Sequence, residues 1–173
     1  MNRARKPELL YQALWPSNTD HFERLLPESF LFVCYAVAMS ERQSYYVGIK
    51  GIIKNEAGDV LILKDASRGK WEVPGGRIDK DQSIIDSFSR EIEEELPGAK
   101  LISLNEVIHV AQGDFLVENE HKLFLAFHLA KVSLPDVLVL SDEHSELAWV
   151  NQSSLSNYPI FTTDQAAIEI SLR

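Results

Sequence analysis

Four glutamates, Glu91, Glu93, Glu94 and Glu95, crowd the last turns of one predicted helix, and no lysine stands beside them. The carboxyl end of a helix carries partial negative charge, so carboxylates at this end cost stability. Like charges four residues apart, as in Glu91 and Glu95, also repel each other. The segment therefore predicts that a positive charge from outside this helix pairs with the glutamates. A hard divalent cation fits this role, because Mg²⁺ prefers carboxylate and carbonyl oxygens.

The helix that must position these acids has recognisable ends. Ser83 followed three residues later by Asp86 predicts an N-cap, and Pro97-Gly98 predicts the exit. At about 100° per residue, the apolar side chains between these ends share one arc of roughly 120°. This predicted buried stripe consists of Ile84, Ile85, Phe88, Ile92 and Leu96.

The acids take different places on the same helical wheel. Glu91 and Glu95 lie near or inside the apolar arc, Glu94 lies about 60° from Glu91, and Glu93 falls on the solvated side. An unpaired buried carboxylate would shift its pKa and become neutral. Three carboxylates therefore converge, with at least two pressed toward the protein interior.

Arg90 offsets part of this charge, through Asp86 or Glu94 at four-residue spacing. The alternative interpretation is a solvated acidic helix. Such helices usually interleave lysines at four-residue spacing, and this helix has none on that face. The pattern favours metal binding over a solvated surface.

Gly75-Gly76 precedes the helix by a short loop. Glycine allows close backbone approach and a positive φ, so a carbonyl or amide there can face a metal or a phosphate. Two adjacent glycines alone usually mark only a turn. Their fixed distance from Arg90-Glu91 and Glu94-Glu95 makes the combined pattern specific.

This spacing resembles the signature of the Nudix hydrolase family over residues 76–98. The residues that match it in register are Gly76, Arg90, Glu91, Ile92, Glu94 and Glu95. The flanking segments 70–74 and 141–150 are similar too, which extends the likeness over about residues 47–170. Two positions depart from the signature: Gln82 replaces its first glutamate, and Pro97-Gly98 replaces its final pair. Because Gln82 can still accept a hydrogen bond from Arg90, we expect retuned or weakened activity rather than none.

The resemblance implies an α/β/α sandwich with a mixed β-sheet. It also implies hydrolysis of the pyrophosphate of a nucleoside diphosphate linked to another group, with Mg²⁺ or Mn²⁺ as cofactor. Such metals neutralise phosphate charge and lower the pKa of bound water. By matching position, the metal shell would be the Gly75 carbonyl, Glu91, Glu94 and Glu95, with Arg90 beside it.

The general base varies within the family. It would be Glu91, or a residue of a later loop, here Glu118, Glu120, Glu143 or His144. Glu120 and Glu143 are preferred by family position, since they lie just before the predicted strands at 122–130 and 147–150.

Other candidate side chains favour structural roles. His121 and His128 are expected to be structural or solvated. Trp71 and Tyr46 could stack a nucleotide base, although aromatic residues in strands more commonly belong to the core.

The remaining pattern predicts strands on both sides of this central helix, at residues 45–53, 60–63, 70–73, 106–111, 122–130 and 147–150. Residues 55–59 predict a hairpin turn between the first two strands. Thr162 to Gln165 predicts a capping box that opens a last helix reaching about Leu172. The apolar run Phe30–Met39 fits either a strand or a buried helix.

The 173 residues suggest a single core. We expect a Nudix domain at 45–173 and an extension of unassigned role at 1–44, with a homodimer contact as one candidate role. The net charge of −9 disfavours a nucleic-acid polymer or an anionic membrane as partner. A single cysteine, Cys34, and the lack of a long apolar run predict a cytoplasmic protein. The expected partner is a small nucleotide substrate.

Two other functions compete with the hydrolase. A catalytically weak or silent nucleotide-binding sensor is favoured by Gln82 and by the unassigned extension, although such a module would be expected to lose the metal acids first. A protein-interaction domain would use the apolar run Phe30–Met39. The sequence leaves nucleotide sugars, ADP-ribose, dinucleoside polyphosphates and damaged nucleotides open as substrates.

Overall fold

The computed structural model describes residues 44–117 and 121–173. Its elements, in chain order, are β1 (Tyr45–Ile53), β2 (Val60–Asp65), β3 (Trp71–Glu72), α3 (Ile84–Glu95), β4 (Lys100–Val117), β5 (His121–Ser133), β6 (His144–Val150), the 3₁₀ helix η1 (Leu155–Asn157) and α4 (Thr162–Ser171). The predictions for Cys34, for the apolar run 30–39, for the extension and for Glu118 and Glu120 lie outside these residues.

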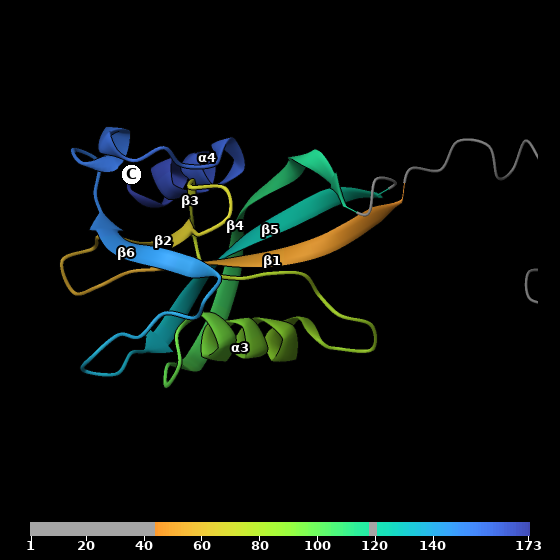
Figure 1. Ribbon diagram of the computed structural model, residues 1–173, viewed down its shortest axis with the longest axis horizontal. Helices are drawn as coiled ribbons and strands as arrows, with labels where there is room; N and C mark the ends of the chain where they lie inside the picture. Colours follow the sequence, from red (N-terminus) through yellow and green to blue (C-terminus); the bar gives the residue numbers. More distant parts are fainter. Residues whose placement is uncertain (1–43, 118–120) are drawn as a thin grey trace, which may run out of the picture. The chain divides into compact units, whose positions relative to one another are not determined.

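The described strands form two three-stranded sheets (Figure 1). In the first, of order β1-β5-β4, β1 runs parallel to β5 and β5 runs antiparallel to β4. In the second, of order β3-β2-β6, both pairings are antiparallel. The predicted mixed sheet is therefore confirmed, and a smaller antiparallel sheet accompanies it.

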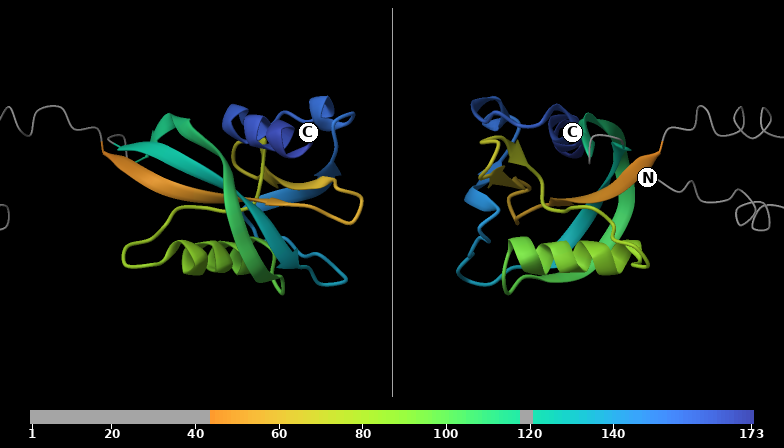
Figure 2. Two further views of the ribbon diagram at one scale, coloured as in Figure 1. Left: turned by 180° about the vertical axis from the view of Figure 1, so that it is seen from behind. Right: turned by 45° about the vertical axis from the view of Figure 1, so that its right-hand side comes forward.

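Two hydrophobic cores lie on opposite faces of these strands. In β1, Ile49 and Ile53 pack in the core that holds α3, whereas Ile52 packs in the core that holds α4. The same alternation divides β2, where Leu61 and Leu63 join the first core, and Val60 and Ile62 join the second. Because strand side chains alternate between faces, each face needs its own cover. α3 and α4 supply it from opposite sides (Figure 2), which confirms the α/β/α sandwich.

Helix α3 begins as predicted, because the Ser83 side chain accepts a hydrogen bond from the Asp86 N–H at 3.1 Å. Phe88, Ile92 and Leu96 of the predicted stripe are fully buried. The prediction for the first turn is wrong, since Ile84 and Ile85 are 50% and 59% exposed. A helical wheel gives the direction of a side chain, but not whether the opposing surface extends far enough to cover it.

The predicted hairpin turn between the first two strands also needs correction. The turn at 55–59 forms, with the Asn55 N–H donating to the Asp59 carbonyl at 3.0 Å. However, only the bridge Lys54↔Val60 joins the flanking segments, and β1 and β2 enter different sheets, so no extended hairpin exists.

The predicted capping box of α4 is wrong as well. Phe161 occupies the N-cap position and its side chain makes no cap hydrogen bond. The Phe161 carbonyl accepts the first intrahelical hydrogen bond, from the Gln165 N–H at 2.9 Å, so Thr162 already lies inside the helix. None of the helices in the described part of the chain combines the length and the apolar character needed to cross a lipid bilayer.

Candidate active site

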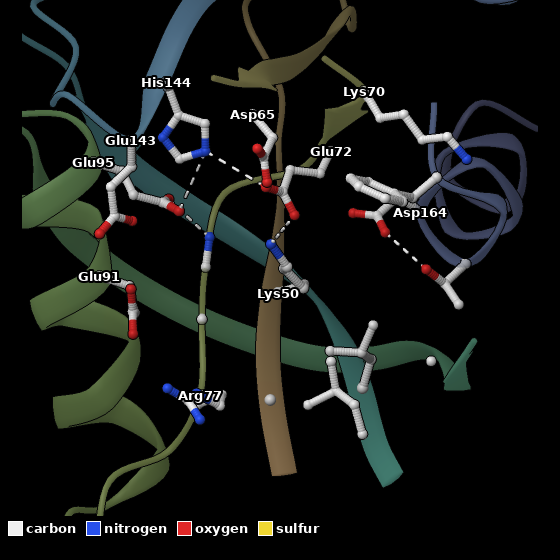
Figure 3. A pocket seen from close by; sticks show the side chains of 18 of the residues that line it. Lys50, Asp65, Lys70, Glu72, Arg77, Glu91, Glu95, Glu143, His144 and Asp164 are labelled. Carbon is white, nitrogen blue, oxygen red and sulfur yellow. Dashed lines mark hydrogen bonds and ion pairs between the residues drawn. The ribbon is translucent and has the colours of Figure 1, made fainter. Parts of the chain in front are cut away.

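A cavity of about 890 Å³ opens between α3, β1, the glycine turn, the start of β6 and the start of α4 (Figure 3). Nearly all predicted site residues in the described ranges line it: Gly75, Gly76, Arg90, Glu91, Glu94, Glu95, Glu143 and His144. Segments that lie far apart in the sequence, from the glycine turn to the start of β6, therefore meet in one site.

The two glycines are needed for different reasons. Gly75 has φ +126°, and a Cβ there would lie 2.2 Å from the Ile49 carbonyl oxygen. Its N–H donates to the Glu95 Oε2 at 2.9 Å. At Gly76 a Cβ would lie 2.3 Å from the Glu91 Oε1. The turn thus packs its bare backbone directly against two of the acids, which any larger residue would prevent.

The helical wheel predicted the burial of the acids correctly. Glu95 is 5% exposed, and the side chain of Glu91 is 13% exposed. The Glu94 side chain is 57% exposed, and Glu93 is exposed to solvent. The solvent exposure of these acids therefore increases from Glu95 through Glu91 to Glu94.

Arg90 pairs with the acids nearer the solvent. Its Nη1 lies 2.7 Å from the Glu94 Oε2, and its Nη2 lies 2.9 Å from the Glu91 Oε1. Asp79 adds a third contact at 3.2 Å. The prediction of a Glu94 pair is confirmed, whereas Asp86 instead accepts a hydrogen bond from Ser83 at 2.6 Å.

Gln82 supports this arginine without a charge. Its Oε1 accepts a long hydrogen bond of 3.4 Å from the Arg90 Nε and one of 3.0 Å from the Ser87 hydroxyl. The prediction that Gln82 accepts from Arg90 is therefore confirmed.

The sequence reasoning missed Lys50, a buried cation of the site that pairs with Glu72 and interacts electrostatically with Glu95. It lies buried on β1, with its Nζ 2.9 Å from the Glu72 Oε2 and 3.1 Å from the Val73 carbonyl. Burial opposes its charge, but Glu72, Asp164 and Glu95 outweigh burial and raise the pKa of Lys50. The signal that would have found it is a lysine at an inward position of an otherwise apolar strand.

Burial dominates the pKa of the innermost glutamate. It raises the pKa of Glu95 to about 7, against the opposing effects of Lys50, His144 and the Gly75 N–H. Burial likewise raises the pKa of Glu91, although Arg90 opposes it. Burial also tends to raise the pKa of Glu72, but the nearby Lys50 charge outweighs burial and lowers the pKa of Glu72. The pair Lys50–Glu72 is therefore ionic, while Glu95 lacks full charge compensation.

His144 lies against the same acids. Its Nε2 is 3.6 Å from the Glu72 Oε1 and 3.8 Å from the Glu95 Oε1, which is too long for direct hydrogen bonds. Its buried Nδ1 has no hydrogen-bond partner in the described part of the chain. Burial disfavours the charged imidazole, but the two carboxylates outweigh it and raise the pKa of His144. Glu143, in contrast, is exposed at the cavity.

The aromatic and histidine candidates of the strands are mainly structural. Trp71 is buried in the α4 core, and Tyr46 is half-buried against it. His128 places its Nδ1 2.8 Å from the Asn105 carbonyl. The side chain of His121 lies outside the described residues.

The donor set is compatible with a divalent cation. Glu91, Glu94, Glu95 and the glycine turn offer only oxygen ligands, which suit Mg²⁺ or Mn²⁺. The bare backbone of Gly76 leaves the Glu91 carboxylate in contact with the turn, where any Cβ would displace it. Across 44–117 and 121–173, however, no three His, Cys, Asp or Glu side chains form a ready-made metal cluster. The metal shell is therefore still a prediction.

The chain is similar in sequence to several known proteins. The nucleoside triphosphatase NudI of Klebsiella pneumoniae is 29% identical over 125 residues, which cover 63% of this chain and 84% of that protein. The CTP pyrophosphohydrolase of Escherichia coli is 24% identical over 127 residues, covering 70% and 87%. The 8-oxo-dGDP phosphatase NUDT18 of Danio rerio is 34% identical over 62 residues, which span 34% of this chain and only 18% of that protein.

Solved structures of similar fold support the same relationship. The MutT protein of Methanosarcina mazei superposes with a TM-score of 0.61 at 25% identity, covering 76% of this chain and 96% of that one. A MutT NUDIX hydrolase of Burkholderia pseudomallei gives 0.60 at 26% identity, covering 73% and 98%. The prediction of a Nudix-type pyrophosphohydrolase is confirmed at the level of these homologues. Since the NUDIX domain matches residues 45–169, the chain belongs to the NUDIX family.

Proposed function

We propose that this chain is a Mg²⁺- or Mn²⁺-dependent pyrophosphohydrolase that cleaves a nucleoside diphosphate linked to another group. The observation that carries the proposal is the glycine turn packed against Glu91 and Glu95 inside a large cavity. The named relatives act on nucleotides according to their names, which supports the substrate class. In this proposal the Gly75 carbonyl, Glu91, Glu94 and Glu95 hold the metal.

The cavity also carries cationic side chains suited to phosphate. Arg68, Lys70 and Arg77 line it although the chain has a net charge of −9. Arginine and lysine bind phosphate oxygens through charge-assisted hydrogen bonds. Their presence beside the acids supports a polyphosphate that spans the cavity.

Residues of the chain would orient the substrate and handle the proton. When bound, the metal neutralises phosphate charge and lowers the pKa of the attacking water. Arg90 holds Glu91 and Glu94 in place, and Glu143 or Glu120 accepts the proton from the water. Glu143 is exposed at the cavity and directly precedes β6, so its carboxylate is accessible to water.

A substrate screen tests this function. Nucleoside diphosphate sugars, ADP-ribose, dinucleoside polyphosphates and nucleoside triphosphates would each be incubated with Mg²⁺ or Mn²⁺, and the phosphorylated products identified by mass. We expect metal-dependent release of a nucleoside monophosphate and a phosphorylated second product from the diphosphate derivatives. Absence of metal-dependent turnover for every compound would contradict the proposal.

A catalytically weak or silent nucleotide sensor is the second candidate. The observation that favours it is Gln82, an uncharged residue contacting Arg90 at 3.4 Å. Such a sensor would bind nucleotide in calorimetry without forming product in the same screen.

We also propose the division into a Nudix domain at 45–173 and an extension at 1–44 that contributes to a homodimer. Light scattering of the full chain would then show concentration-dependent association that is independent of metal. A monomer at all concentrations would contradict this role.

A further inference from the structure

The segment Glu72–Gly76 leads into the glycine turn, and its backbone is held from several sides. The Pro74 carbonyl accepts from the Gly51 N–H at 2.8 Å, and the Gly76 carbonyl accepts from the Ile49 N–H at 2.8 Å. These two contacts tie the segment to β1 through backbone alone.

Val73 differs, because charged side chains hold both of its backbone polar groups. Its N–H donates to the Asp164 Oδ1 at 3.0 Å, and its carbonyl accepts from the Lys50 Nζ at 3.1 Å. Asp164 comes from α4 and Lys50 from β1, and both side chains are buried. Figure 3 shows the Lys50 ammonium next to the Glu72 carboxylate, with the Asp164 side chain farther to the right.

Stability alone gives little reason for these buried charges. Replacing a buried ion pair by well-packed apolar residues is often neutral or stabilising, because burying charge carries a large desolvation cost. Two buried charges that converge on a single residue, two positions before Gly75, instead point to a requirement for geometry. Lys50 also contacts Glu72, so one ammonium group holds β3 and the start of the turn together.

We propose that Lys50 and Asp164 are positioning residues that clamp Val73 and thereby fix the Gly75 turn against Glu95. The inference rests on the proposed metal site. Both residues line the cavity, but in this proposal neither acts on the reacting atoms: the Lys50 ammonium is engaged with Glu72 and Val73, and the Asp164 Oδ2 accepts from the Thr163 hydroxyl at 2.9 Å.

The direction in which the cation affinity changes when Lys50 is replaced distinguishes a positioning role from a purely electrostatic one. Lys50 is a positive charge that interacts with Glu95. If charge were its only effect, replacing it would remove repulsion and strengthen the binding of a cation. If it positions the turn, replacing it weakens cation binding. The two explanations therefore predict opposite changes in affinity.

The experiment is a calorimetric titration of the full chain with Mn²⁺, alongside its Lys50→Met, Asp164→Leu and Asp164→Asn variants. We expect Lys50→Met and Asp164→Leu to weaken Mn²⁺ binding by about 10- to 100-fold, the range typical of residues that orient metal ligands. Asp164→Asn should stay within about threefold of the parent, because its amide oxygen still accepts from Val73 at nearly unchanged shape.

A fourth variant controls for loss of folding in Lys50→Met. Lys50→Met leaves the Glu72 carboxylate buried without its partner, which is strongly destabilising. The double variant Lys50→Met/Glu72→Gln removes both charges, and its Mn²⁺ affinity should be weak as well. Thermal unfolding of each variant confirms that the protein titrated is folded.

The outcomes separate the two proposals. If the parent binds no Mn²⁺ at millimolar concentration, the metal site is overturned, and the clamp with it. The clamp is overturned, and the metal site stands, if the parent binds Mn²⁺ and both Lys50→Met and Lys50→Met/Glu72→Gln bind it equally or more tightly. Equal weakening by Asp164→Asn and Asp164→Leu would also overturn the clamp, because it would assign the effect to charge.

Discussion

The two sides of the glutamate helix obtain their countercharges differently. On the solvent side, Glu94 pairs with Arg90 four residues earlier in the same helix. On the inner side, Glu95 contacts the Gly75 N–H and interacts with Lys50 and His144, which come from other elements. Local pairs of this kind contribute little to stability, whereas breaking a buried pair is costly.

The difference shows why identical residues in one helix have unequal roles. A solvent-side acid can leave its arginine at low cost, which suits a group that must rearrange around a ligand. A buried acid fixed by distant elements is held in place by the fold. The predictions below test this division, from the largest expected effect to the smallest.

Glu95→Gln and Glu94→Gln should each lower kcat by more than about 10²-fold while the fold stays intact, because each removes a proposed metal ligand. Steady-state kinetics with saturating Mg²⁺ and circular dichroism measure both effects. Glu93→Gln is the matched control, since Glu93 is exposed and should leave turnover unchanged. Unchanged turnover in both variants would contradict the metal assignment. If only Glu94→Gln lowers turnover, the buried Glu95 is not a metal ligand.

Either Glu143→Gln or Glu120→Gln should lower kcat by roughly 10²-fold with little change in KM, the size expected for loss of a general base. The pH profile of that variant should lose its acidic limb. Glu146→Gln serves as control, because Glu146 pairs with Lys64 at 2.6 Å and does not line the cavity. Parent-like kinetics in both variants would contradict the loop assignment, and the proton acceptor would then be Glu91 or a metal-bound hydroxide.

How far the sequence predicts this site depends on how far apart the partners lie. Short-range patterns worked: Ser83 as the cap, Glu91 and Glu95 as inward acids, and the limits of β1 all agree with the structure. Lys50 and Asp164 were missed, because nothing near either residue indicates that both converge on Val73.

Strand lengths were underestimated for a related reason. β4 and β5 pair with each other from Lys100↔Ser133 to Val117↔His121, well beyond their apolar cores. Backbone hydrogen bonds between neighbouring strands extend a ladder where side-chain alternation gives no signal.

Asp65, a carboxylate that lines the cavity but is paired within its own turn, provides a test with a smaller expected effect. Asp65 accepts hydrogen bonds from the Ser67 hydroxyl at 2.7 Å, from the Arg68 and Ser67 N–H groups at 2.8 Å each and from the Arg68 Nε at 2.6 Å. Together these bonds outweigh burial and lower the pKa of Asp65. Its stabilising contribution is therefore present above the unfolded pKa of about 3.9 and is lost as the pH falls below that value. Asp65→Asn should cost about 1 to 2 kcal/mol at pH 7 in urea unfolding, and less at pH 3.

The control for this measurement is Asp142→Asn, which changes an exposed carboxylate. A loss for Asp65→Asn that is equal at both pH values would show that shape rather than charge stabilises the turn.

Gln82→Glu should have the smallest effect, with kcat/KM unchanged or raised by about twofold to threefold. A carboxylate would strengthen the 3.4 Å contact with Arg90 and so steady the arginine that holds Glu91 and Glu94. Kinetics at several Mg²⁺ concentrations measure the change. A large loss of activity would indicate that Gln82 contacts the substrate directly.

The parallel pairing of β1 with β5 has a consequence for the order of folding. The chain between these strands contains β2, β3, α3 and β4, so their pairing must close a long loop, which slows folding. The antiparallel β4–β5 pair and helix α3 depend on shorter-range contacts. Because Lys50 reaches Val73 only from a docked β1, we expect Mn²⁺ binding to return in the slowest refolding phase, after the far-ultraviolet circular dichroism signal. Simultaneous recovery of both signals in stopped-flow refolding would show that β1 docks early.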